Sequence, residues 1–162
     1  MFRISIIIMV LSLSIMAKNF NFTELRYSDA IGKTIELQGQ ITFSKDGLSI
    51  LYPKSKRALK YFDDTLLYEL NNEVVELDFM QQQYMIQYFE ILILLHNGDE
   101  SSLGSEFDIN KKQEVIVLTP KGTLKNYINK IELFKENKLL EYVKLYLNNN
   151  DSIMITIHDK VK

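Results

Sequence analysis

The chain has no cysteine among its 162 residues, and this absence excludes several kinds of protein. Without a thiol there is no disulfide, no cysteine nucleophile and no cysteine-bound metal. The chain is also not a lipoprotein acylated on an N-terminal cysteine. Its folded state must therefore depend on the burial of apolar side chains, which a chain of this length can supply.

Histidine is scarce, and the two present have no metal-binding partner nearby in the sequence. Neither His96 nor His158 has a second histidine or a carboxylate at metal-ligand spacing. The sequence has no glycine-rich phosphate loop, nucleophile elbow or His-Glu-x-x-His motif. The pair Asp63-Asp64 is typical of a turn rather than of a catalytic pair. We therefore expect structural roles for both histidines, and no enzymatic activity, metal or cofactor.

Positive charge is not in excess. The chain has 19 Lys and Arg against 21 Asp and Glu, a formal net charge of −2. A nucleic-acid partner usually requires a basic surface, so we expect none.

One long apolar run is present, at the N-terminus. Arg3 precedes the uncharged stretch 4–15, and Met16-Ala17 leads into the polar Lys18. This pattern predicts a secretory signal peptide over residues 1–17, cleaved before Lys18, with an apolar core too short to span a bilayer. The alternative is a membrane anchor that stays attached. Residues 18–162 would then form a single domain that works outside the cytoplasm.

The first segment after this run predicts a short helix over residues 20–31. Asn21 is a suitable N-cap and Glu24 stands three residues later, as in a capping box. Gly32 would end the helix.

The remaining chain alternates mostly with a period of two, which predicts an antiparallel meander. Asp46-Gly47 predicts a hairpin, and Asp63-Asp64 and Asn71-Asn72 predict turns. The strands are expected at residues 33–43, 48–52, 57–62, 66–70, 74–79, 106–109, 114–121, 127–134, 139–147 and 152–158.

A stretch without turn residues, 80–96, interrupts the meander and predicts a helix that is apolar on most sides. Such a helix needs burial. The polar Gly/Ser stretch 97–105 predicts a mobile loop, and the strand 139–147 is apolar on both faces. Two interpretations follow: an ordinary core with the helix packed across the sheet, or a curved sheet that encloses an apolar cavity with the helix as its lid.

The order of these parts resembles the periplasmic outer-membrane lipoprotein carrier (LolA-like) family of the LolA/LolB superfamily. Short matching segments lie along most of the chain after residue 17. They are Phe22-Thr23-Glu24, Gly32-Lys33, Gly39-Gln40-Ile41, Leu51-Tyr52-Pro53, 117–121 and Ile131-Glu132-Leu133.

The resemblance implies an α+β fold in which a curved antiparallel sheet forms an incomplete, half-open β-barrel closed by short helices. It implies a monomeric periplasmic carrier whose cavity receives lipoprotein acyl chains from an inner-membrane exporter and passes them to an outer-membrane acceptor. The alternatives are a carrier of another lipid and a non-catalytic envelope interaction module that uses the same half-barrel.

One segment departs from the family. Ser44-Lys45-Asp46-Gly47 stands where the family usually has Arg-Pro, so Lys45 is the candidate latch for the lid. A lysine does not reproduce the bidentate fork of arginine. The residues expected to line the acyl-chain cavity share one parity within their strands or lie on the helix. They are Leu37, Ile41, Phe43, Leu59, Tyr61, Leu66, Tyr68, Val75, Leu77, Tyr84, Tyr88, Phe89 and Leu92.

Overall fold

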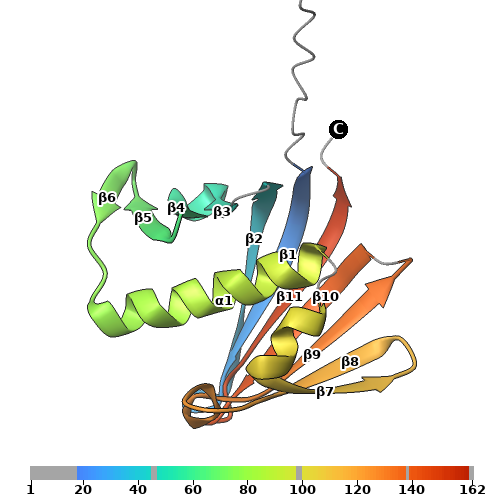
Figure 1. The fold of residues 1–162 in the computed structure, drawn as a ribbon. Helices are drawn as coiled ribbons and strands as arrows, with labels where there is room; N and C mark the ends of the chain where they lie inside the picture. Colours follow the sequence, from blue (N-terminus) through green and yellow to red (C-terminus); the bar gives the residue numbers. More distant parts are fainter. Residues whose placement is uncertain (1–17, 45–46, 98–99, 138, 161–162) are drawn as a thin grey trace, which may run out of the picture.

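The computed structural model describes residues 18–44, 47–97, 100–137 and 139–160 (Figure 1). Within these ranges the chain forms one antiparallel sheet of eleven strands and one α-helix. The predicted signal segment 1–17 and the candidate latch Lys45 lie outside the described residues.

The strands follow the chain in two meanders. The first contains β1 (Lys18–Ser28), β2 (Lys33–Ser44), β3 (Gly47–Tyr52), β4 (Arg57–Phe62), β5 (Thr65–Leu70) and β6 (Glu73–Val75). The second contains β7 (Phe107–Lys112), β8 (Val115–Pro120), β9 (Ile128–Glu136), β10 (Leu139–Leu147) and β11 (Ser152–Lys160). The helix α1 (Phe79–Asn97) connects them, and short 3-10 turns occupy Pro53–Ser55, Glu100–Ser105 and Leu124–Asn126.

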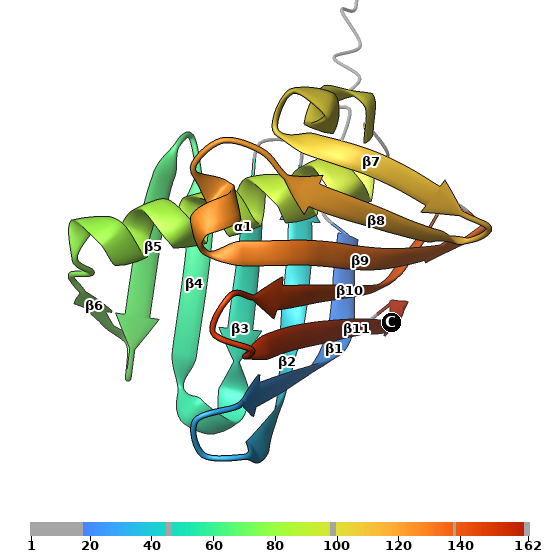
Figure 2. The same ribbon diagram turned by 90° about the horizontal axis from the view of Figure 1, so that it is seen from below.

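Pairing of β1 with β11 joins the two meanders, so the order across the sheet is β6-β5-β4-β3-β2-β1-β11-β10-β9-β8-β7. The helix therefore links the two edge strands of the described sheet. Figures 1 and 2 show that the sheet is strongly curved and that α1 lies on its concave side, between the two halves. In agreement with this, α1 contacts β3 and β5 from one half and β10 from the other.

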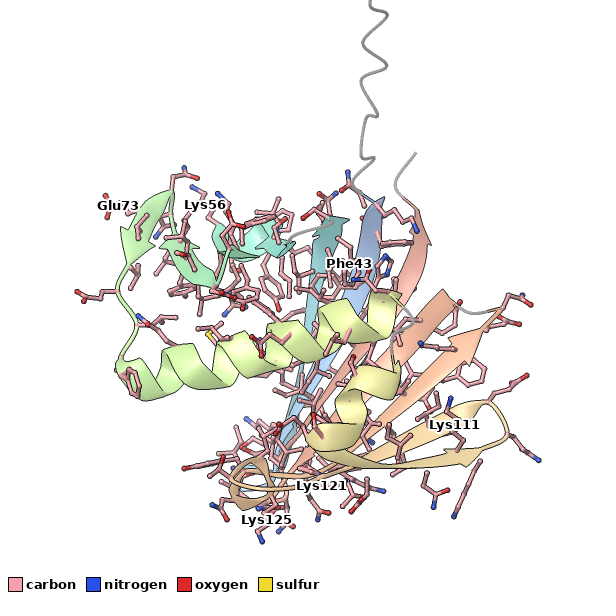
Figure 3. All side chains as sticks on the ribbon, viewed as in Figure 1. Phe43, Lys56, Glu73, Lys111, Lys121 and Lys125 are labelled. Carbon is pink, nitrogen blue, oxygen red and sulfur yellow. The ribbon has the colours of Figure 1, made fainter. Side chains whose placement is uncertain are left out.

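The predicted curved antiparallel sheet is present, but the described strands do not close into a barrel. Among the described residues a single α-helix of 19 residues lies across the concave face, so closure by several short helices is not seen there. Figure 3 shows side chains filling much of the space between this helix and the sheet, with Phe43 near the C-terminal end of the helix. The same view shows Lys111, Lys121 and Lys125 at the outer rim.

The predicted opening helix is wrong, since residues 18–28 form β1. Phe20, Phe22 and Glu24 are buried on one face while Asn21 is exposed, which is the two-residue period of a strand. Pairing with both β2 and β11 places β1 in the middle of the sheet, and these ladders override the local capping signal. Gly32, with a φ of +59°, ends the tight turn between β1 and β2 instead of a helix.

Most strand and turn predictions are confirmed. The turn residues Asp63, Asp64, Asn71 and Asn72 have φ values of 48°, 59°, 54° and 67°, as expected for two-residue hairpin loops of type I′. The largest difference in a strand boundary concerns the strand expected at 74–79. This prediction is wrong beyond Val75, because β6 ends there and α1 begins at Phe79.

The second meander differs from the prediction in two places. Strand β7 continues to Lys112, beyond the expected end of this strand at residue 109, and Gln113, with a φ of 57°, makes the turn to β8. The stretch expected to be a loop contains the 3-10 turn Glu100–Ser105, while residues 98–99 lie outside the described residues.

Candidate functional site: an apolar cavity with a buried polar cluster

A cavity of about 770 Å³ lies between α1 and the concave face of the sheet. Its walls come from both halves of the sheet, from the helix, and from the segments 124–128 and 147–149. The lining residues are Glu24, Arg26, Ile50, Tyr52, Leu59, Met85, Tyr88, Phe89, Leu124, Asn126, Tyr127, Ile128, Leu145, Leu147, Asn148, Asn149 and Ile153. A volume of this size is typical of a site for one small-molecule ligand.

Most of the wall is aliphatic or aromatic. Ile50 and Leu59 contribute from one half of the sheet, Leu145 from the other, and Phe89 from the helix, and all four are buried. Water makes few hydrogen bonds against such walls, so an apolar ligand is favoured over water. The exposed lining residues Asn126, Tyr127, Asn148 and Asn149 form the mouth of the cavity.

The middle of α1 is attached to strand β4 beside the cavity. The rings of Phe89 and Tyr61 lie 6.2 Å apart. The Tyr61 hydroxyl is 3.1 Å from Oε1 of Glu90 and 3.1 Å from Oδ1 of Asp64, so its single proton can be donated to either carboxylate. Burial, followed by these two acceptors, raises the pKa of Tyr61 above its usual value. A neutral tyrosine therefore links the helix to the sheet.

The C-terminal end of α1 is held by aromatic packing. The His96 ring stacks on Phe43 with centroids 3.9 Å apart and an angle of 4° between the planes. Phe20 meets the same ring edge-on at 5.8 Å. Burial, and then the positive charges of Lys18 and Lys135, lower the pKa of His96 to about 4. The imidazole is therefore neutral at physiological pH and packs against Phe43 as an uncharged aromatic ring.

A buried polar cluster interrupts the apolar wall. Glu24 of β1 is 1% exposed and lines the cavity. Its Oε1 accepts a hydrogen bond from Nε of Arg26, and its Oε2 accepts one from the Tyr52 hydroxyl. The guanidinium of Arg57 lies 4.5 Å from the centre of the Tyr52 ring. The carboxylate of Glu24 therefore contacts one guanidinium group and one phenol, and a second guanidinium group lies over the ring of that phenol.

The contacts within the cluster raise the pKa of both Tyr52 and Arg26. Burial, and then the charge and hydrogen bond of Glu24, raise the pKa of Tyr52 well above its usual value. For Arg26, burial lowers the pKa, but the hydrogen bond and charge of Glu24 outweigh it and the net change is upward. Tyr52 thus remains a neutral donor and Arg26 remains a cation.

Two buried polar atoms of this region have no hydrogen-bond partner among the described residues. They are Oη of Tyr88, on the helix, and Nε of Arg57, on β4. Burial, and then the charge of Glu24, raise the pKa of Tyr88 well above its usual value, so this hydroxyl keeps its proton. Because a buried polar group without a partner destabilises a fold, each such atom requires an explanation.

The structure distributes the residues predicted to bind acyl chains over several places. Leu59, Tyr88 and Phe89 line the cavity. Ile41, Phe43, Tyr61 and Leu92 are buried in the core, and Leu37 packs against them. Leu66, Tyr68, Val75 and Leu77 line a second hollow of about 320 Å³ between β5, β6 and the start of α1. The Tyr84 side chain, like Lys45, lies outside the described residues.

Sequence reasoning missed most of the cavity. The sequence predicts a capping role for Glu24, although Phe20, Phe22 and Glu24 share the parity of a strand. The sequence pattern around Leu145 and Leu147 does point to a cavity. The strand 139–147 is apolar on both faces, and such a strand either has both faces covered by other elements or has one face lining a cavity. The mouth segments carried no signal, because they meet only when both meanders are in place.

No family model matches this sequence, and no curated protein is similar to it in sequence. Its fold is similar to solved structures at low identity. A LolA superfamily protein from Nitrosomonas europaea is 10% identical with a TM-score of 0.42, over 92% of this chain and 87% of that one. A DUF1329 family protein from Desulfovibrio piger is 10% identical with a TM-score of 0.44, over 91% and 85% of the two chains.

A third solved structure is a putative outer membrane lipoprotein-sorting protein domain from Vibrio parahaemolyticus, also 10% identical with a TM-score of 0.44, over 90% and 84% of the two chains. Likenesses at this level assign no function, so we derive one from the cavity.

Two absences hold for the part of the chain that the structure describes. No helix there is both long and apolar enough to cross a membrane. The same residues bring together no group of three or more histidines and carboxylates that could hold a metal ion.

Proposed function

We propose that this protein carries acyl chains in the cavity between α1 and the sheet. The single observation that supports this most directly is the 770 Å³ cavity, whose walls are largely aliphatic and aromatic and whose mouth is polar. Such a site gains free energy from every apolar group that leaves water, about 0.8 kcal/mol per buried methylene. No covalent chemistry is needed for this function.

The setting we propose is the periplasm, reached through cleavage of residues 1–17 before Lys18. The first candidate cargo is the acyl chains of lipoproteins, received from an inner-membrane exporter and delivered to an outer-membrane acceptor, with the carrier as a monomer. This setting is supported by the apolar N-terminal run and by the resemblance of the sequence to LolA-like carriers. N-terminal sequencing of protein from the cell envelope tests the cleavage.

Native mass spectrometry of protein purified from a bacterial envelope tests acyl-chain binding. We expect bound lipid in the unmodified protein and its loss in Ile153→Trp, which places an indole in the cavity. The matched control is Met154→Trp, because the next residue on β11 points to the other face of the sheet. Lipid retained by Ile153→Trp, or absent from the unmodified protein, would exclude this cavity as the carrier site.

A second candidate function is an envelope interaction module. It is supported by exposed apolar side chains at the β5–β6 edge of the described sheet and at the start of α1, namely Leu67, Leu70, Val74, Val75 and Phe79. Exposed apolar groups of this kind often mark contact surfaces. Crosslinking in intact cells at position 74 tests this alternative, which predicts a protein partner there and no lipid in the cavity.

A further inference from the structure

The polar cluster in the cavity wall contains more hydrogen-bond donors than acceptors. Both oxygens of Glu24 are occupied, one by Arg26 and the other by Tyr52. A guanidinium has five N–H donors, and Arg26, which lines the cavity, uses its Nε for Glu24 while 43% of its side chain remains exposed. The Tyr88 hydroxyl adds a buried donor that has no partner among the described residues. The cluster therefore offers at least one donor, the Tyr88 hydroxyl, that no acceptor among the described residues satisfies.

The same cluster also has an excess of positive charge. Arg26 and Arg57 contribute two positive charges, and Glu24 contributes one negative charge, while burial keeps the two tyrosines neutral. Beside an apolar wall, where water screens charge less than in bulk, an unbalanced charge interacts more strongly with a ligand. An anionic oxygen group would both balance this charge and accept hydrogen bonds from the donors that lack an acceptor.

We infer that Arg26 and Tyr88 bind the anionic head group, a carboxylate or phosphate, of a single-chain amphiphile whose acyl chain lies along the apolar wall. This inference rests on the proposed function, because Arg26 and Tyr88 can serve as an anchor for the head group only if the acyl chain lies in the same cavity. It makes a lipid other than a lipoprotein the preferred cargo. The ligand class is that of fatty acids and alkyl phosphates.

The test is the displacement of a fluorescent apolar probe, N-phenyl-1-naphthylamine, from the purified protein at pH 8. The competitors are palmitate, hexadecyl phosphate and the uncharged methyl palmitate. We expect palmitate or hexadecyl phosphate to bind about tenfold more tightly than the ester, and the tighter of the two identifies the head group. Equal binding of all three would overturn the anchor but leave acyl-chain binding intact. Failure of the probe and of every competitor to bind would overturn the proposed function itself.

Tyr88→Phe separates a ligand contact from a structural role. Removal of a buried hydroxyl without a partner should leave the thermal stability of the empty protein unchanged or raise it. The same change should weaken binding of the anionic ligand about tenfold and leave methyl palmitate unaffected. Tyr142→Phe is the matched control, because Tyr142 stacks on Phe134 and does not line the cavity. Loss of stability in Tyr88→Phe, or unchanged affinity for the anion, would contradict the inference.

The guanidinium is tested without leaving a carboxylate unpaired. The double variant Glu24→Gln/Arg26→Gln removes both charges of the ion pair, and its thermal melting reports whether the fold is retained. We expect a folded protein that no longer prefers the anion over the ester. If the folded double variant still binds the anion more tightly than the ester, the anionic group binds at another site and the inference is wrong.

Discussion

The Tyr52 hydroxyl donates a hydrogen bond to Oε2 of Glu24, which joins β3 to β1 across the intervening strand β2. A second contact also joins β1 to β3: the rings of Phe22 and Tyr52 meet edge-on with centroids 5.5 Å apart. Gly39 of β2 lies directly opposite Phe22. A strand without a side chain at this point lets groups from its two neighbours meet above it.

The first prediction concerns Gly39→Ala. A Cβ atom at this position would lie 2.6 Å from the Phe22 ring, and the backbone carbonyl of Leu51 is equally crowded. The ring must move, which disturbs its contact with Tyr52, and overpacking of this kind costs about 1–3 kcal/mol of folding free energy. Urea denaturation measures the loss. Gly104→Ala is the control, since nothing lies within 4 Å of a Cβ there, and an equal loss in both variants would contradict this account.

The second prediction concerns Glu24→Gln. The amide still accepts from Tyr52 or Arg26 but no longer balances the guanidinium, so the variant keeps a cation in a largely buried wall. We expect a loss of about 2–3 kcal/mol, below the full cost of breaking a buried pair because Arg26 is partly exposed. Urea denaturation beside Glu36→Gln, a change at an exposed position of β2, measures the difference. A loss no greater than that of Glu36→Gln would show that the pair contributes nothing to stability.

The third prediction concerns pH and His96. Its pKa is about 4 in the folded protein, below the ordinary value of 6.5, so the unfolded chain binds the extra proton first. The stabilising contribution is complete above pH 6.5 and is lost as the pH falls from 6.5 to 4. Because His96 is only half-buried, we expect a loss of roughly 1–2 kcal/mol over that range.

His96→Phe isolates this contribution from that of the carboxylates, which titrate in the same range. Phenylalanine preserves the stack on Phe43 but has no proton to gain. The pH dependence of the free energy of unfolding between pH 6.5 and 4 should therefore be shallower in the variant. Identical slopes in the two proteins would mean that His96 is not the titrating group.

The sequence predicts the meander and the helix well, because most strands have a two-residue period and the turns at Asp63-Asp64 and Asn71-Asn72 have residues that tolerate positive φ. It failed at β1, where Asn21 and Glu24 at helix-capping spacing favour a helix locally. The ladders to β2 and β11 form between residues far apart in the chain, and no local pattern reports them.

The sequence predicts the cavity as one of two interpretations, but of the described residues that it predicts to line the cavity only Leu59, Tyr88 and Phe89 do so. Its walls lie where β1, β3, β4, β10 and β11 approach the helix. Whether a residue lines the cavity therefore depends on the curvature of the sheet as well as on the parity of the residue within its strand. Leu66 and Tyr68 illustrate this dependence. They have the inward parity on β5 but lie beyond the cavity, in the second hollow near the edge of the sheet.

The last prediction concerns the helix as a lid. A carrier must admit and release its ligand, so the cover of the cavity must be able to move. The carboxylate oxygens of Asp64 and Glu90 are each 3.1 Å from the Tyr61 hydroxyl, one on the β4–β5 turn and the other on α1. Since the chain has no cysteine of its own, Asp64→Cys/Glu90→Cys introduces two thiols that a short bismaleimide can link across this contact.

In the linked protein we expect the fold to persist while uptake and release of a fluorescent fatty acid slow by at least about tenfold, because α1 can no longer separate from the sheet. The unlinked double variant is the control, and it should exchange ligand as fast as the unmodified protein or faster, since it lacks the Tyr61 acceptors. Stopped-flow fluorescence measures both rates. If the linked protein exchanges ligand at the control rate, the ligand enters at the mouth formed by Asn126 and Asn148 without movement of α1, and the helix is a fixed wall of the cavity rather than its lid.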